Sequence, residues 1–204
     1  MLVAALAAVM LLAGCAAPAH QYVSAKSYGM YFALPNGWAQ VPDAQLTTAE
    51  QGWRDDAGSV FTQTLLWQGA WAGGTRNADD VLAATPTTVP IVFTFVRDLL
   101  PVEQQSIGPD PTTALQDLIV PASSLPAGSV ATTPLREAGF VGIRQRAAYP
   151  VHGVPQTTEV VSMLAPGKKR VYVLLIRCTT ACFRAQRPAI DAIIGSLTFK
   201  EPRA

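Results

Sequence analysis

The chain has 204 residues, of which 15 are Lys or Arg and 14 are Asp or Glu, so its formal net charge is +1. Half of the residues are hydrophobic and only 14 % are charged, which excludes a disordered chain and suffices for one domain with its own core. The charges are unevenly placed, since residues 1–135 hold four basic and ten acidic side chains and residues 136–204 hold eleven basic and four acidic.

The first segment, Leu2 to Gly14, contains only apolar or small residues. Thirteen such residues are too few for a membrane-spanning helix, which needs about 20, and they are typical of the apolar part of a signal peptide. Leu12-Ala13-Gly14-Cys15 resembles the bacterial lipobox. This resemblance implies cleavage before Cys15 and acylation of its sulfur, with more than one acyl chain, palmitate among them, for stable anchoring.

These features predict a lipoprotein signal peptide at residues 1–14, a polar tether at 15–27 and one domain at 28–204. We expect the protein on the extracytoplasmic face of the cell membrane, held by its lipid, and therefore away from nucleic acid. Two alternatives stay open. The apolar run could be a buried segment that ends in Cys, and the absence of a basic residue before Lys26 leaves open whether the true start lies upstream of Met1.

The first half of the domain mixes strand and helix patterns. Tyr28 to Leu34 predicts a strand that ends at Pro35, and a turn follows at Pro35-Asn36-Gly37. Asp43 to Trp53 predicts a short helix. Residues 60–74 are ambiguous: Trp67 and Trp71 are spaced for one helix face, while the neighbouring Val, Phe and Thr residues favour a strand. A buried strand is expected at 90–96 and a short helix at 111–119.

The second half predicts an antiparallel meander followed by a helix and a last strand. Val171 to Ile176 is apolar on both faces, which indicates a central strand with a layer on each side. The four strands of the meander are separated by short turns, and such turns join antiparallel neighbours. The expected elements are strands at Thr133–Glu137, Phe140–Tyr149, Gln156–Leu164 and Arg170–Arg177, a helix at Arg187–Gly195 and a strand at Ser196–Phe199.

Two cysteines remain once Cys15 is assigned to the lipid: Cys178 and Cys182. An oxidising compartment permits a disulfide between them. Bridged Cα atoms lie roughly 4.4–6.8 Å apart, whereas four residues of extended strand span about 13 Å. The bridge therefore requires a bend between Thr179 and Ala181. Free thiols and a redox-active pair are the alternatives, although the spacing is not that of a C-x-x-C motif.

Two segments together resemble a known family. The N-terminal Tyr31–Trp38 (YFALPNGW) and the C-terminal Ile193–Phe199 (IIGSLTF) are similar to the opening and closing segments of Mog1/PsbP-like domains. With the lipobox, the chain resembles the LpqN-type lipoproteins of mycobacteria and related actinobacteria. This resemblance implies an α+β fold, a central antiparallel sheet with helices on both faces (an α/β/α sandwich), and roles in binding and assembly. It implies no reaction.

The sequence offers little chemistry for catalysis. Its two histidines are His20, within the predicted tether, and His152, in a predicted turn. No serine-hydrolase, metal-binding or phosphate-loop motif is present, so no catalytic residue, metal or cofactor is predicted. Three tryptophans are candidates for lining a ligand site, although an aromatic pair spaced like Trp67 and Trp71 more often packs in a core: Trp53, Trp67 and Trp71.

Two functions follow from these observations. The first is a lipid-anchored, non-catalytic envelope module that binds another envelope or extracellular protein. The second is a carrier or sensor of an apolar small molecule or lipid, for which a cavity of about 300 Å³ or more would be needed. Clustered basic side chains from the second part of the chain could also contact anionic headgroups or an acidic partner, unless they are simply solvated strand faces.

Overall fold

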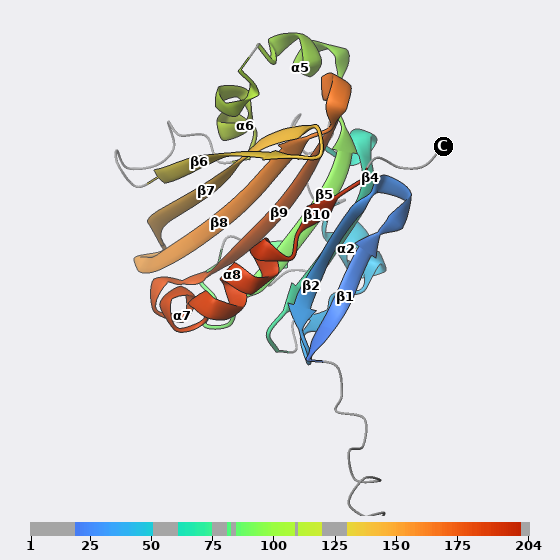
Figure 1. The fold of residues 1–204 in the computed structure, drawn as a ribbon. Helices are drawn as coiled ribbons and strands as arrows, with labels where there is room; N and C mark the ends of the chain where they lie inside the picture. Colours follow the sequence, from blue (N-terminus) through green and yellow to red (C-terminus); the bar gives the residue numbers. More distant parts are fainter. Residues whose placement is uncertain are drawn as a thin grey trace, which may run out of the picture.

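The computed structural model describes residues 19–50, 61–74, 81–82, 85–108, 110–119 and 130–200. Its largest element is a seven-stranded antiparallel sheet in the order β3-β4-β5-β9-β8-β7-β6 (Figure 1). The strands of this sheet are β3 (Ala39–Gln40), β4 (Leu65–Ala72), β5 (Ile91–Asp98), β6 (Val130–Glu137), β7 (Phe140–Val151), β8 (Val154–Leu164) and β9 (Arg170–Thr179).

A second layer lies over one face of this sheet, which we call the front face. It contains a three-stranded antiparallel sheet in the order β1-β2-β10 and two helices beside it (Figure 1). Short 3-10 turns connect β1 to β2 (η1, Lys26–Tyr28) and β8 to β9 (η3, Pro166–Lys168). The elements of the front layer are β1 (His20–Ala25), β2 (Met30–Pro35), β10 (Thr198–Phe199), α7 (Thr180–Ala185) and α8 (Arg187–Gly195).

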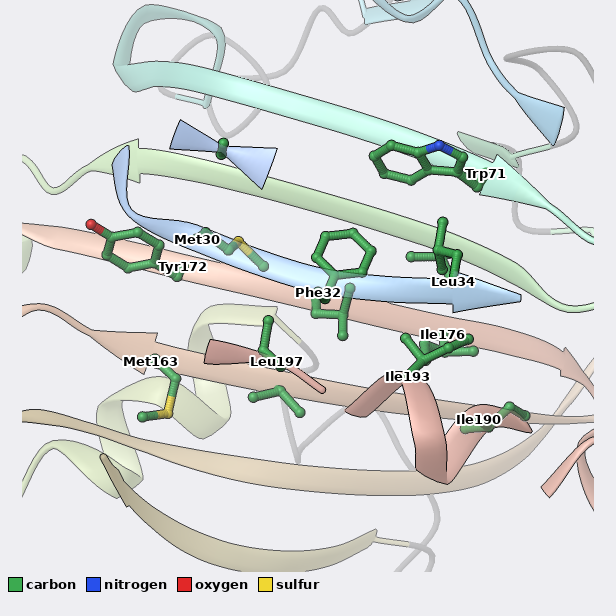
Figure 2. Close-up of a cluster of buried hydrophobic side chains, with 14 of the residues drawn as sticks. Met30, Phe32, Leu34, Trp71, Met163, Tyr172, Ile176, Ile190, Ile193 and Leu197 are labelled. Carbon is green, nitrogen blue, oxygen red and sulfur yellow. The ribbon is translucent and has the colours of Figure 1, made fainter. Parts of the chain in front are cut away.

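The main core fills the space between the front face and this layer. Alternate residues of β9 point toward it, as period-2 side-chain geometry requires, and β2 and α8 supply the opposing side chains (Figure 2). Its largest fully buried members include Met30, Phe140, Met163, Tyr172 and Ile176. The hydroxyl of Tyr172 donates a hydrogen bond to the carbonyl oxygen of Tyr28 at 2.8 Å, which joins the two sheets.

The opposite, back face is covered by α2 (Asp43–Glu50) and α6 (Pro111–Ile119). Leu46 of α2 packs against Ala70 and Ile91, and Leu115 of α6 packs against the residues of β7 to β9 that point backward. A further short helix, α5 (Pro101–Ser106), follows β5 at one end of the sheet. No helix among the described residues is long and apolar enough to cross a membrane.

The predicted fold class is confirmed: the domain is α+β, with an antiparallel sheet and helices on both of its faces. The ambiguous segment is divided: residues 61–64 are helical, whereas Leu65–Ala72 forms β4, which its pairing with β5 fixes as a strand. The predicted helix at 43–53 is present from Asp43 to Glu50, and residues 51–53 lie outside the described part of the chain. The helix α5 was not predicted.

The predicted boundary between tether and domain is wrong. Residues His20 to Ala25, assigned to the tether, form β1 and pair with β2 in continuous register from His20↔Pro35 to Ala25↔Met30. Only alternate residues of β1 face inward, and Ala25 is the one fully buried side chain among them. The domain therefore begins at or before His20, five positions after Cys15, rather than at residue 28.

Candidate functional site

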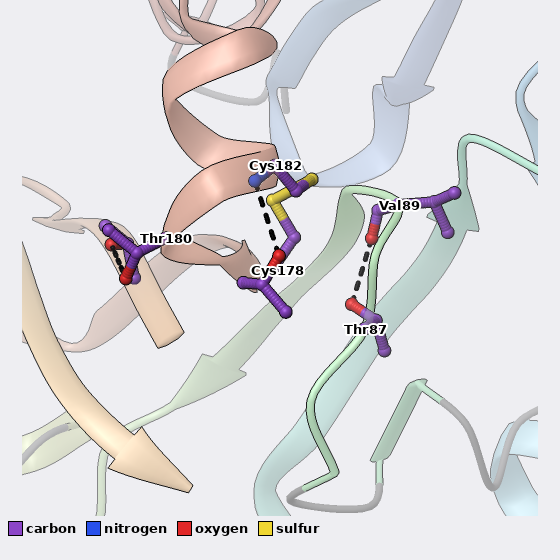
Figure 3. The surroundings of a disulfide bond; sticks show 7 residues. Thr87, Val89, Cys178, Thr180 and Cys182 are labelled. Atoms are coloured by element: carbon purple, nitrogen blue, oxygen red, sulfur yellow. Dashed lines mark hydrogen bonds between the residues drawn. A yellow bond between two sulfur atoms is a disulfide. The ribbon is translucent and has the colours of Figure 1, made fainter. Parts of the chain in front are cut away.

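The predicted disulfide is present between Cys178 and Cys182, whose Cα atoms lie 6.0 Å apart (Figure 3). The bend it requires is the junction between β9, which ends at Thr179, and α7, which begins at Thr180. The Thr179 hydroxyl accepts a hydrogen bond from the backbone N–H of Cys182 and so caps the helix. Cys15, the predicted lipidation site, lies outside the described residues.

Of the three tryptophans proposed to line a ligand site, Trp71 and Trp67 belong to the main core and Trp53 lies outside the described residues. Trp71 is 4 % exposed and packs edge to face on Phe32, with ring centroids 5.6 Å apart (Figure 2). Its indole lies across Gly69, where an added Cβ would come within 2.4 Å of the ring. Neither Trp67 nor Trp71 lines either of the two cavities described below.

His152 occupies the two-residue turn between β7 and β8, with φ of 49° at His152 and 80° at Gly153. Positive φ at both turn residues is the geometry that joins tightly paired antiparallel strands. The side chain of His152 is exposed. Within the described ranges, no group of three or more His, Cys, Asp or Glu side chains is placed to hold a metal ion.

The larger of the two cavities, of about 600 Å³, lies between α5, α6 and the end of the sheet. We call it the α5–α6 cleft. Its floor is apolar, since Leu99, Leu115 and Leu164 are buried there. The remaining lining residues come from α5, α6 and the loop between them: Glu103, Ser106, Ile107, Gly108, Asp110, Thr113 and Ala114.

The polar groups at this cleft are held by neighbouring side chains. Both carboxylate oxygens of Glu103 accept hydrogen bonds from Arg97, at 2.6 and 2.9 Å, and one also accepts from the backbone N–H of Leu100 at the start of α5. The hydrogen bonds from Arg97 hold the pKa of Glu103 below its ordinary value. Lys168 donates to the carbonyl oxygen of Gly108 at 2.7 Å, which ties the loop to the sheet.

A group of five charged side chains lies on the front face beside α7 and α8. Glu159 of β8 accepts hydrogen bonds from Arg144 at 2.5 Å and from Arg146 at 2.8 Å, and its own side chain is 0 % exposed. Asp191 of α8 accepts from Arg144 at 2.8 Å and from Arg187 at 2.6 Å. We call Arg144, Arg146 and Arg187 the arginine cluster.

Electrostatics and an aromatic ring hold this cluster together. Burial alone would raise the pKa of Asp191, but hydrogen bonds from Arg187 and Arg144 bring it below its ordinary value. The guanidinium carbons of Arg146 and Arg187 lie 5.8 and 6.0 Å from the centre of the Phe183 ring, within the range of a cation–π contact.

The second cavity, of about 210 Å³, is a groove on the front face between the α8–β10 segment and strands β6 to β8. We call it the front groove. Arg144 lines it and thereby joins it to the arginine cluster, and Arg136 and Glu137 are its other charged residues. Its apolar lining consists of Leu135, Val161, Met163, Ile194, Leu197 and Phe199, with Gly195 between them.

Neither cavity was predicted from the sequence, and for the arginine cluster the sequence indicated only that the second part of the chain is basic. One signal was present: Arg144 and Arg146 are separated by one residue in a predicted strand, so they must share a face. The sequence contained no equivalent signal for Glu159 or Asp191, because pairing of β8 with β7 and packing of α8 bring them there. The cleft is likewise formed by elements that meet only in the folded chain.

Known structures provide the comparison for the fold, since no protein-family model and no curated protein matches the sequence. The structure of LpqN from Mycobacterium tuberculosis, described as involved in cell envelope biogenesis, matches with a TM-score of 0.51 and 16 % identity over 89 % of this chain and 91 % of that one. The Ran-binding protein Mog1p of Saccharomyces cerevisiae matches with a TM-score of 0.48 and 8 % identity over 89 % of this chain and 96 % of that one. The cyanobacterial PsbP of Synechocystis matches with a TM-score of 0.42 and 13 % identity over 92 % of this chain and 96 % of that one.

The match to LpqN extends over nearly the whole of both chains. It confirms, at the level of the fold, the resemblance predicted from the two terminal segments. At 16 % identity the likeness shows a shared fold and nothing about a shared partner or ligand.

Proposed function

We propose that this chain is an accessory protein of the bacterial cell envelope, anchored through an acylated Cys15, that acts by binding another envelope or extracellular protein and not by catalysis. Two observations support the location. The segment ending at Cys15 resembles a lipobox, and the fold is that of LpqN, a protein described as involved in cell envelope biogenesis.

The observation that carries the binding role is the α5–α6 cleft. In Figure 1, α5 and α6 lie at the end of the domain opposite to the start of β1. With Cys15 in the membrane, five residues before His20 span at most about 18 Å, so the start of β1 stays close to the lipid surface. The cleft then faces away from the membrane, where a partner can reach it.

The cleft has the composition of a protein-binding surface. Interfaces place apolar side chains at the centre and polar groups at the rim, and here Leu99, Leu115 and Leu164 lie under a polar rim. Val102 on α5 is 64 % exposed, which extends the apolar surface beyond the cleft itself. A partner that inserts an apolar side chain between the two helices fits this arrangement.

A second function is favoured by the size of the same cleft. Its volume of about 600 Å³ lies within the roughly 300–1,000 Å³ of small-molecule sites. The cleft could therefore hold an apolar small molecule or lipid, and the protein would then act as its carrier or sensor. Native mass spectrometry of the protein purified from its own envelope distinguishes the two functions, because a carrier retains a bound mass that a protein-binding module lacks.

The anchor is tested by replacing Cys15 with Ser. Mass spectrometry of the mature wild-type protein should detect an N-terminal Cys15 carrying acyl chains, and Cys15→Ser should lack them and leave the membrane fraction. An unmodified, uncleaved Cys15 in the wild-type protein contradicts the anchoring.

The binding role is tested by site-specific photo-cross-linking in the intact envelope. A photoreactive residue at Thr113, in the cleft, should give one discrete cross-linked protein band, and the same residue at the exposed Thr48 of α2 should not. Equal cross-linking from both positions, or from neither, contradicts a partner at the cleft.

A further inference from the structure

The carboxylate of Glu159 is fully buried, although both of its arginine partners reach the protein surface. Its side chain is 0 % exposed, yet the side chains of its partners Arg144 and Arg146 are 27 % and 35 % exposed. Arg146 is directly opposite Glu159 in the β7–β8 register, and Arg144 is its diagonal neighbour on the same face. One carboxylate thus holds two guanidinium groups side by side at the protein surface.

Stability alone explains this arrangement poorly. Burying an ion pair removes both charges from water, and apolar residues of the same size are often at least as stabilising in its place. A buried carboxylate does fix the orientation of its arginine partners, because each guanidinium is a planar fork that is held in place once two of its N–H groups are bound. Arginines oriented in advance lose less conformational freedom when they bind a ligand.

The arginine cluster retains donors for such a ligand. Hydrogen bonds from Arg144 and Arg146 to Glu159 and Asp191 use the Nε and Nη2 atoms, and among the described residues no hydrogen bond is made by Nη1 of either arginine. Three arginines face two carboxylates, so the cluster keeps one positive charge. Guanidinium groups with free N–H donors bind carboxylate and phosphate oxygens, often through two hydrogen bonds at once.

The front groove begins at the same arginine. Arg144 lines the groove, and beyond it the lining is apolar and includes Leu135, Met163 and Leu197. A fixed positive group therefore adjoins an open apolar channel.

We propose that the arginine cluster and the front groove form one binding site for an anionic amphiphile, a molecule with a carboxylate or phosphate head and a short hydrocarbon tail. The head binds Arg144 and Arg146, and the tail lies over Leu135, Met163 and Leu197. This site is on the front face, whereas Leu164 and Leu115 of the α5–α6 cleft belong to the core on the back face. The inference therefore does not rest on the proposed function.

The test is a calorimetric titration of the chain carrying Cys15→Ser, which cannot be acylated. The probes are octyl phosphate, octanoate and octanol, together with vesicles of phosphatidylglycerol or phosphatidylcholine. Octyl phosphate and octanoate should bind about tenfold or more tightly than octanol, since a hydrogen bond to a charged group changes affinity by that order. The vesicles show whether the head group belongs to a membrane lipid. It does if phosphatidylglycerol vesicles retain the protein and the variants described below weaken this retention as they weaken binding of the small probes.

Four variants locate the site. Arg144→Gln removes the head contact, and Gly195→Leu fills the groove, where an added Cβ meets open space and the backbone φ is not positive. Each should weaken binding about tenfold. The matched controls are Arg184→Gln, an exposed arginine of α7 outside the cluster, and Gly74→Leu, another glycine with open space around it. Both controls should bind as the parent chain does.

Three results overturn the proposal: equal affinity for octanol and the anionic probes, an effect of Arg184→Gln equal to that of Arg144→Gln, or no binding of any probe. The second result would indicate diffuse attraction of anions to a basic surface, and the third an ion-pair network that only supports the fold. Thermal unfolding of each variant shows that a loss of binding is not a loss of folding.

Discussion

Glu159 and Arg144 form an ion pair between β8 and β7 in which the carboxylate has no exposed surface and the Nε–Oε1 distance is 2.5 Å. Arg146 contacts the same carboxylate at 2.8 Å, so either arginine can neutralise it when the other is absent. The two arginines are therefore expected to be coupled in their effect on stability.

The coupling predicts a non-additive pair of substitutions. Arg144→Gln or Arg146→Gln alone should lower the free energy of unfolding by about 1 kcal/mol, and the double variant by about 3–5 kcal/mol, because it leaves a buried carboxylate without a partner. Glu159→Gln in the double variant should recover most of this loss. Urea denaturation compares these four variants with the parent chain, and purely additive effects would show that Glu159 does not depend on these arginines.

A second prediction concerns the pH dependence of stability. The pKa of Glu103 is lowered in the folded protein by its hydrogen bonds from Arg97, so the unfolded state binds the proton first as the pH falls. This contribution to stability is present above the ordinary pKa of 4.5 and is lost as the pH falls below it. Glu103→Gln should therefore lose less stability between pH 6 and pH 3 than the parent chain.

The control for this experiment is Glu137→Gln, which removes an exposed carboxylate on β6 that makes no ion pair within the described residues. Urea denaturation at several pH values compares the three chains. If Glu103→Gln follows the parent chain at every pH, the Arg97–Glu103 pair contributes nothing to acid sensitivity.

A third prediction distinguishes the core role of Trp71 from a ligand-lining role. Gly69→Ala places a Cβ against the indole and should lower the free energy of unfolding by about 1–3 kcal/mol through overpacking. Trp71→Ala should lower it by about 3–5 kcal/mol. Gly74→Ala, where nothing lies within 4 Å of the added Cβ, is the control. A Trp71→Ala protein as stable as its parent would mean that the ring lies outside the core.

A fourth prediction concerns the bridge between Cys178 and Cys182. The loop that it closes is short, so the chain-entropy relation gives about 2 kcal/mol of stabilisation. Reduction of the protein, or the double substitution of both cysteines by Ser, should lower the free energy of unfolding by this amount without changing the fold. Reductant should have no further effect on the double variant, and a parent chain indifferent to reductant contradicts a bridge in the native protein.

The sequence predicted most strands of the large sheet because their signals are local. Short turns join β7, β8 and β9, and the unbroken apolar run of β9 indicated its central place. The strand β1 was missed because it buries little of its surface and is held mainly by its pairing with β2. The segment around Trp67 stayed ambiguous because residues four apart share a face in a helix and also in a strand, and only pairing with β5 decides between them.

The candidate sites could not be predicted in this way. The front groove combines side chains of β6, β7, β8, α8 and β10, and the cleft combines α5, α6 and the ends of β5 and β8. A sequence gives the face on which a side chain lies within its own element, but it does not give the neighbour that packs against that face. The bend between Cys178 and Cys182 was predictable because disulfide geometry connects two positions directly.

If the protein acts by binding through the α5–α6 cleft, a side chain that fills the cleft should prevent binding. Ala114→Trp places an indole in the cleft, and Ala44→Trp places one on the exposed surface of α2 as the control. The quantity to measure is the yield of the protein or small molecule that is cross-linked to a photoreactive residue at Thr113 in the intact envelope. Ala114→Trp should abolish this yield while Ala44→Trp preserves it, and an unchanged yield from a folded Ala114→Trp protein would rule out binding through the cleft.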